Sequence, residues 1–114
     1  MKKIILVGLL TLTSSPIMLA QKHAPQIHRQ VTRPGIYPES STRLLRLSDI
    51  QDLNSWDLKI MRNEIFARHG YIFQTQDMID YFYQQSWYSP KYEDVAILLT
   101  IIEKKNISFI KKYE

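Results

Sequence analysis

The sequence predicts a small, mainly all-α domain of about four helices, in which one central helix is packed on both sides. Three observations lead to this fold class. The chain has 114 residues, which is enough for one domain. Helix start and stop signals recur in its second half, where apolar residues repeat at helical spacing. The sequence has no cysteine, so burial and polar pairing must stabilise the domain without disulfides.

Residues 1–20 have the pattern of a cleavable signal peptide. Lys2 and Lys3 give a positive start, and the apolar run Ile4–Leu12 follows. This run is shorter than the roughly 20 residues that span a bilayer. Ala20 is a small residue suited to a cleavage site. We therefore expect export to the periplasm or the extracellular space, with no stable membrane anchor after cleavage. An uncleaved anchor is the alternative.

Residues 21–43 have the composition of a disordered basic linker. Pro25, Pro34 and Pro38 interrupt regular structure, and apolar residues are few. Without the leader, 13 basic residues face 11 acidic ones, and they form no concentrated basic stretch. This balance argues against nucleic-acid binding. A solvated tail is the simplest interpretation of the linker, and contact with an anionic cell surface is the alternative.

The domain is predicted to begin at residue 44, where apolar density rises. Ser48 and Gln51 have capping-box spacing, which predicts a short helix over Asp49–Leu53. Asn54 or Ser55 then caps a longer helix, which Gly70 ends by taking a left-handed conformation.

Two apolar stripes run along this longer helix. One contains Leu58, Met61 and Ile65, and the other contains Trp56, Ile60 and Ala67. The helix is therefore expected to pass through the middle of the domain, and its polar residues must be paired.

The polar residues of the central helix have expected partners. Glu64 and Arg68 are four apart in the favourable order and can pair directly. Arg62 lies near an apolar stripe and needs an acceptor elsewhere, such as a carboxylate or a helix-end carbonyl. His69 lies in the last turn, where the helix dipole favours a cation.

The run Arg62–Tyr71, Arg-Asn-Glu-Ile-Phe-Ala-Arg-His-Gly-Tyr, resembles the signature of the YARHG domain family of bacterial exported proteins. Further matches lie at Phe73, Tyr81-Phe82, Gln85-Ser86-Trp87-Tyr88 and Ile102-Glu103-Lys104-Lys105-Asn106-Ile107. The resemblance covers nearly all of 44–114 and implies an extracytoplasmic domain, but no particular activity. Phe66 stands where the family name has tyrosine, so any role of a phenol hydroxyl is absent.

The remaining chain is also mainly helical in prediction. Thr75 is expected to cap a helix that runs to about Gln84, with Met78 and Phe82 toward the core. Residues 93–99 fit an extended or a helical segment.

Thr100 and Glu103 form a capping box for the last helix. Asn106 interrupts the apolar stripe of this helix, which contains Ile102, Phe109 and Tyr113. We expect Asn106 to be buried and to meet the polar groups of the central helix, or its end near His69.

Candidate binding residues are the polar groups of the covered helices and two loop aromatics: Arg62, Asn63, Glu64, Arg68, His69, Trp87, Tyr88 and Asn106. The sequence favours a mainly structural role for residues 62–70, with a binding site as the alternative. Trp87 and Tyr88 are more typical of a small core than of a ligand platform. No nucleophile, metal-ligand set or cofactor motif is recognisable, so we expect no catalytic residue, metal or cofactor.

Two function classes remain. The first is an exported binding or interaction module for a cell-envelope component or a protein partner. The second is a small cell-envelope hydrolase, or a hydrolase accessory, that uses His69 and Arg68. An open cleft that contains both residues and Trp87 would favour the hydrolase. A His69 ring whose nitrogens are occupied by protein partners would favour the binding module.

Overall fold

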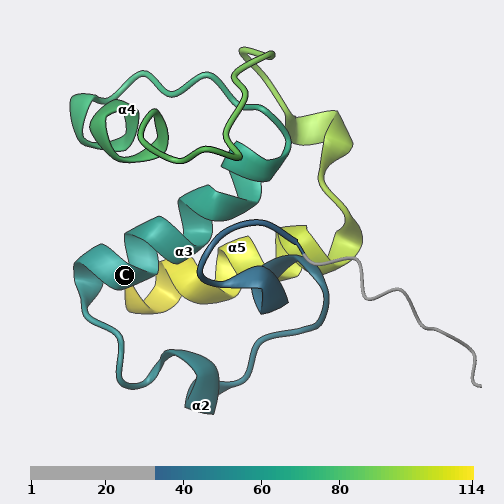
Figure 1. The fold of residues 1–114 in the computed structure, drawn as a ribbon. Helices are drawn as coiled ribbons and strands as arrows, with labels where there is room; N and C mark the ends of the chain where they lie inside the picture. The colour runs from purple at the N-terminus through teal and green to yellow at the C-terminus, as the bar shows by residue number, and fades with distance from the viewer. Residues whose placement is uncertain (1–32) are drawn as a thin grey trace, which may run out of the picture. The chain divides into compact units, whose positions relative to one another are not determined.

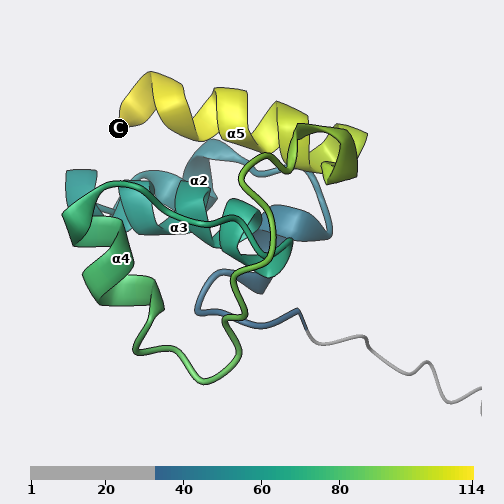
Figure 2. The same cartoon turned by 90° about the horizontal axis from the view of Figure 1, so that it is seen from above.

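The computed structural model describes residues 33–114, which form a mostly helical domain (Figures 1 and 2). Its elements are η1 (Pro38–Ser41), α2 (Leu47–Ile50), α3 (Ser55–Arg68), α4 (Gln76–Phe82), η2 (Ala96–Leu98) and α5 (Ile101–Tyr113). The predicted fold class is confirmed. The expected signal peptide and most of the expected linker lie outside the described residues. Within them, no helix is long and apolar enough to cross a membrane.

The ends of α3 are fixed by the expected residues. The Asp57 amide donates to Asn54 Oδ1 at 2.9 Å, and the Asn54 amide donates to Asp57 Oδ2 at 3.4 Å. Gly70 ends the helix with a φ of +82°, a conformation that side chains disfavour. A Cβ at Gly70 would also lie 3.0 Å from the carbonyl oxygen of Ser89. Glycine is therefore favoured at position 70 for two independent reasons.

Helix α3 separates two apolar clusters, as predicted. The first joins Leu58, Met61 and Ile65 to Leu45, Ile50 and Ile110. The second joins Ile60 and Ala67 to Phe73, Met78 and Phe82, and Phe73 stacks on Phe82 with ring centroids 4.6 Å apart. Figure 1 shows α3 between α4 and α2, with α5 alongside it.

Trp56 lies on the side of the second stripe, as predicted, but it is not part of the buried cluster. The residue is 46% exposed, because it lies in the first turn of α3 and meets edge to face Tyr81, which packs on that cluster.

Three predicted boundaries also differ from the structure. Helix α2 runs over Leu47–Ile50 instead of Asp49–Leu53. It begins at Leu47 because Asp49 rather than Ser48 closes its first turn: Asp49 Oδ2 accepts from the Arg46 amide at 2.7 Å. Arg43 binds the same carboxylate through two hydrogen bonds and holds its pKa well below its usual range. Helix α4 ends at Phe82, before the predicted Gln84.

The ambiguous segment 93–99 is a short 3-10 turn rather than a strand. Asp94 Oδ1 accepts from the Ala96 amide at 2.8 Å, and this bond starts η2. The predicted capping box of α5 is present, with the Glu103 amide donating to Thr100 Oγ1 at 3.1 Å. The segment between α4 and α5 is therefore held by side-chain to backbone bonds.

The domain begins earlier than the sequence predicted. Residues 34–43 were assigned to the linker, but they lie against the helices, and η1 contacts both α3 and α5. Ser40 and Ser41 are 0% and 8% exposed. Pro38, one of the prolines that suggested a linker, instead begins the 3-10 turn of a compact strap. We call residues 34–43 the N-terminal strap.

Candidate functional site

Arg68 is the centre of a buried polar network that attaches the N-terminal strap to α3. Its side chain is 5% exposed, and all five of its N–H groups are used by protein acceptors. The acceptors are Pro34 O, Tyr37 O, Ser40 Oγ, Ser41 Oγ and Glu64 Oε1, at 2.6 to 2.9 Å. Burial lowers the pKa of Arg68, and the nearby carboxylates of Glu64 and Glu103 oppose this shift. The guanidinium therefore has no donor left for a ligand.

Glu64 forms the second contact of this network with the strap. Its two carboxylate oxygens accept from the amides of Ile36 and Tyr37 at 2.8 and 2.9 Å. Gly35 makes this approach possible, because it has a φ of +109° and its Cβ would lie 2.5 Å from Glu64 Oε1. Burial raises the pKa of Glu64, while the two amides and Arg68 oppose the shift. The predicted Glu64–Arg68 pair is confirmed, and the strap completes it.

His69 extends the network to α5. Its Nε2 lies 2.8 Å from Glu103 Oε1, and Ser41 Oγ donates to Glu103 Oε2 at 2.8 Å. Burial alone would raise the pKa of Glu103, but hydrogen bonds from the Thr100 amide, His69 and Ser41 outweigh it and lower the pKa. The sequence did not predict these contacts of Ser41 and Glu103, because the strap was taken for a linker.

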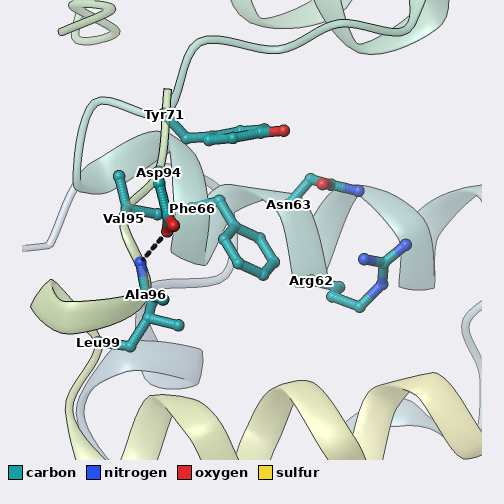
Figure 3. A pocket seen from close by; sticks show the side chains of 8 residues that line it. All are labelled: Arg62, Asn63, Phe66, Tyr71, Asp94, Val95, Ala96 and Leu99. Atoms are coloured by element: carbon teal, nitrogen blue, oxygen red, sulfur yellow. Dashed lines mark hydrogen bonds between the residues drawn. The ribbon is translucent and has the colours of Figure 1, made fainter. Parts of the chain in front are cut away.

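A second group of motif residues lines a groove beside α3 (Figure 3). This cavity of about 260 Å³, which we call the α3 groove, is lined by Arg62, Asn63, Phe66, Tyr71, Asp94, Val95, Ala96 and Leu99. Figure 3 shows the Phe66 ring between the segment 94–99 on one side and Asn63 and Arg62 on the other, with Tyr71 above. A neighbouring hollow shares Arg62, Asn63 and Tyr71. The groove thus has an apolar middle, with Arg62 and Asn63 at one end and Asp94 at the other.

Asn63 is a partly satisfied polar group of this groove. It is 8% exposed, and its Nδ2 donates to the Lys59 carbonyl at 2.9 Å. Within residues 33–114, no protein group donates to its amide oxygen, and this oxygen is not a fully buried atom, so it is accessible from the cavity. An amide that is nine-tenths buried and keeps an open acceptor at a cavity is suited to a ligand donor.

Arg62 stands at the same end of the groove as Asn63 and has the carboxylate partner that the sequence required. Its Nε and Nη2 donate to Glu114 at 2.6 and 2.9 Å, and this pair lowers the pKa of Glu114. Within the described chain, its Nη1 makes no hydrogen bond, so one edge of the guanidinium remains open.

A family model described as the YARHG domain matches residues 34–114. The chain belongs to the YARHG domain family. Domains of this family are generally exported. The match begins at the N-terminal strap, in agreement with the contacts of Pro34. No curated protein and no solved structure matches the chain.

The residues of the family motif have different places in this YARHG domain. Ala67 is buried in the core, Arg68 and His69 belong to the polar network, and Gly70 forms the turn. Phe66 is the one of these five residues that lines the α3 groove. The position where this chain departs from the family name is therefore also the position that faces a cavity.

Trp87 and Tyr88 pack on the second apolar cluster of the YARHG domain. Tyr88 donates to the Tyr71 carbonyl, and Trp87 meets Phe82 edge to face at 6.1 Å. Trp87 also lines a polar cavity of about 310 Å³ together with His69 and Arg68. The cleft that would favour a hydrolase is thus present, but Arg68 has no N–H left for it. The His69 side chain is 23% exposed, and one of its ring nitrogens is occupied by Glu103.

Asn106 is buried as predicted, but its expected partners were wrong. Its Oδ1 accepts from the Leu45 amide at 2.9 Å, and its Nδ2 donates to the carbonyls of Ser40 and Arg43 at 2.8 and 2.7 Å. These bonds attach the strap to α5 rather than to the end of α3. In the described residues, no cluster of three or more His, Cys, Asp or Glu side chains is arranged to hold a metal ion.

Proposed function

We propose that this YARHG domain is an exported interaction module that binds a short, extended peptide segment of a protein partner in the α3 groove. The amide oxygen of Asn63, which accepts from no protein group and stays accessible at the edge of an apolar cavity, carries the proposal. A carboxamide side chain can accept from a peptide N–H with little change in its own position. Asn63 is already fixed by its bond to Lys59 O, so binding costs little side-chain entropy.

The size of the groove favours one anchoring side chain. Small-molecule sites usually measure roughly 300 to 1,000 Å³. The α3 groove measures about 260 Å³ and is lined on its apolar part by Phe66, Val95 and Leu99. A single large apolar residue of a partner fits this volume, and aromatic or aliphatic anchors of this kind carry most of the affinity in protein interfaces.

Arg62 adds a preference for acidic peptides. Its open Nη1 edge lies at the Asn63 end of the groove. A carboxylate next to the anchor residue would share the guanidinium with Glu114, and charge-assisted bonds of this kind are stronger than neutral ones. The expected ligand is therefore an apolar anchor residue followed or preceded by Asp or Glu.

The hydrolase alternative has less support. His69 and Trp87 line the same polar cavity. Arg68 could stabilise an oxyanion there only by breaking its hydrogen bonds to the N-terminal strap. A binding role needs no such rearrangement.

The proposal is tested by selecting binders from a random peptide library with the full chain. We expect the selected peptides to share an apolar anchor beside an acidic residue. Ala96 is exposed and lines the groove, so Ala96→Phe fills the cavity without removing a core contact. It should lower peptide affinity at least about tenfold and leave the free energy of unfolding unchanged.

The matched control is Ile97→Phe. Ile97 is 95% exposed and does not line the groove, so this variant should keep wild-type affinity. Unchanged peptide affinity in Ala96→Phe, or a library that yields no shared motif, would contradict the proposed function.

A further inference from the structure

A second hollow lies between α5 and the chain just before α2. We call it the lysine groove; it is lined by Leu44, Leu45, Lys104, Lys105, Asn106, Ser108, Phe109 and Lys112. Its volume is about 450 Å³, and it shares no residue with the α3 groove. No carboxylate lines it, and Lys104, Lys105 and Lys112 form no ion pair within residues 33–114. The hollow is therefore apolar inside and positively charged at its rim.

The lysine groove has almost no free hydrogen-bonding group that could select a specific ligand. Asn106 uses its oxygen and both amide hydrogens on the Leu45 amide and two strap carbonyls. The Leu45 amide is occupied by the same contact. What remains is apolar surface, lysine ammonium groups and the exposed Ser108 hydroxyl. This differs from the α3 groove, where an amide oxygen is open.

Two exposed leucines lie at the groove and on the chain that follows it. Leu44 lines the groove and is 53% exposed, and Leu47, at the beginning of α2, is 52% exposed. The Arg46 side chain between them is 73% exposed. Projecting leucines among basic side chains match the layered chemistry of an anionic bilayer, in which acyl chains lie beneath phosphate groups.

We propose that the lysine groove and the adjoining Leu44–Leu47 segment form a docking surface for the anionic phospholipid surface of a membrane. The lysines lie over the headgroups, and Leu44 and Leu47 enter the boundary of the acyl chains. An extended peptide is a poorer occupant, since its backbone would find no open hydrogen-bonding partner apart from Ser108. A second copy of the chain is opposed by repulsion between like lysine rims. The attachment is peripheral and reversible, and it is independent of the proposed peptide binding.

Co-sedimentation with lipid vesicles tests this inference. The exported chain is mixed with vesicles of phosphatidylglycerol and phosphatidylcholine, or of phosphatidylcholine alone. We expect binding to the anionic vesicles that weakens as salt is added. Lys104→Gln, Lys105→Gln and Lys112→Gln together should lower partitioning about 100-fold, at about fivefold for each lysine near the surface.

Lys111→Gln is the matched charge control for the single variant Lys105→Gln, because Lys111 is exposed on the same helix but does not line the groove. All variants share the same N-terminal residues, so differences between them report on the groove. Equal partitioning of Lys105→Gln and Lys111→Gln, which remove the same charge, would overturn the proposal. Failure of the wild-type chain to bind anionic vesicles would also overturn it. If the lysine variants then changed binding to an acidic protein partner or dimer formation, that partner or a second copy would be the occupant instead.

A fluorescent label provides a second measurement. The sequence has no cysteine, so Leu47→Cys can be labelled with an environment-sensitive dye at one position. Its emission should shift to the blue on anionic vesicles. The same dye at Gln84→Cys, an exposed position after α4, should not shift. Equal shifts at the two positions, or none at Leu47→Cys, would contradict insertion of this segment.

Discussion

Two faces of helix α3 carry polar residues of the same motif, but they differ in how completely these residues are bonded. On one face, Arg68 uses all five of its N–H groups and Glu64 accepts bonds on both oxygens. On the other face, Asn63 keeps an open amide oxygen and Arg62 keeps an open edge, beside the apolar α3 groove. The saturated face holds the N-terminal strap, and the open face has capacity left for a ligand.

The largest expected effect is on the saturated face. Arg68→Leu leaves the carboxylate of Glu64 buried without its cation and breaks four bonds to the strap. Removing one partner of a buried ion pair costs about 3 to 5 kcal/mol. Urea unfolding should show this loss.

Arg62→Leu is the control for the open face. Its pair with Glu114 is part-exposed and should contribute about 1 kcal/mol or less. Equal losses of unfolding free energy in the two variants would remove the distinction between the faces.

Gly35→Ala tests the contact between the strap and Glu64 without changing a charge. The added Cβ would meet the carboxylate at 2.5 Å, and the φ of +109° disfavours alanine. We expect a loss of about 1 to 3 kcal/mol in thermal or urea unfolding. Ile36→Ala keeps the amide that Glu64 accepts and removes a side chain that is 64% exposed, so it should cost about 0.5 kcal/mol or less. A neutral Gly35→Ala would show that the strap is not held at this point.

The pH dependence of stability should sharpen the comparison within the network. The pKa of Glu103 is lowered from its ordinary value of 4.5, so ionised Glu103 stabilises the fold above that value. This contribution is lost as the pH falls through the folded-state pKa. Glu64 has the opposite sign, because burial raises its pKa.

Glu103→Gln should therefore reduce the loss of stability on acidification, measured by urea unfolding from neutral pH to about pH 3. The Glu64→Gln variant serves as the comparison, and it should not reduce this loss. An unchanged acid dependence in Glu103→Gln would contradict the assigned hydrogen bonds.

The smallest expected effect concerns the open face. Glu114→Gln weakens the pair with Arg62 and should change the free energy of unfolding by about 0.5 kcal/mol. The same variant leaves more of the guanidinium for a ligand carboxylate, so affinity for the selected acidic peptides should rise. Weaker binding of these peptides would show that Glu114 takes part in the site itself.

The sequence predicted those parts of the fold that depend on local patterns. Asn54, Gly70 and Thr100 mark helix ends through short-range bonds, and the two stripes of α3 follow from helical spacing. The Glu64–Arg68 pair lies within one helix and was predicted for the same reason.

The parts that were missed depend on contacts distant in sequence. The strap has the composition of a linker, and its fixed structure arises from partners such as Glu64 and Asn106. The partners of Asn106 were wrong because the strap was not expected beside α5. Asn63 and Arg62 were named as candidates, but the open and saturated faces could not be separated without knowing how many bonds each residue makes.

Side-chain NMR gives the most direct test of the division between the two faces. A peptide selected from the library is added to the ¹⁵N-labelled chain, and the Asn63 side-chain amide and the Arg68 Nε–H resonances are followed. We predict that the Asn63 amide shifts and that Arg68 Nε–H, bonded to the Pro34 carbonyl at 2.6 Å, does not. A shift at Arg68 with none at Asn63 would place the ligand at the polar network and contradict the account.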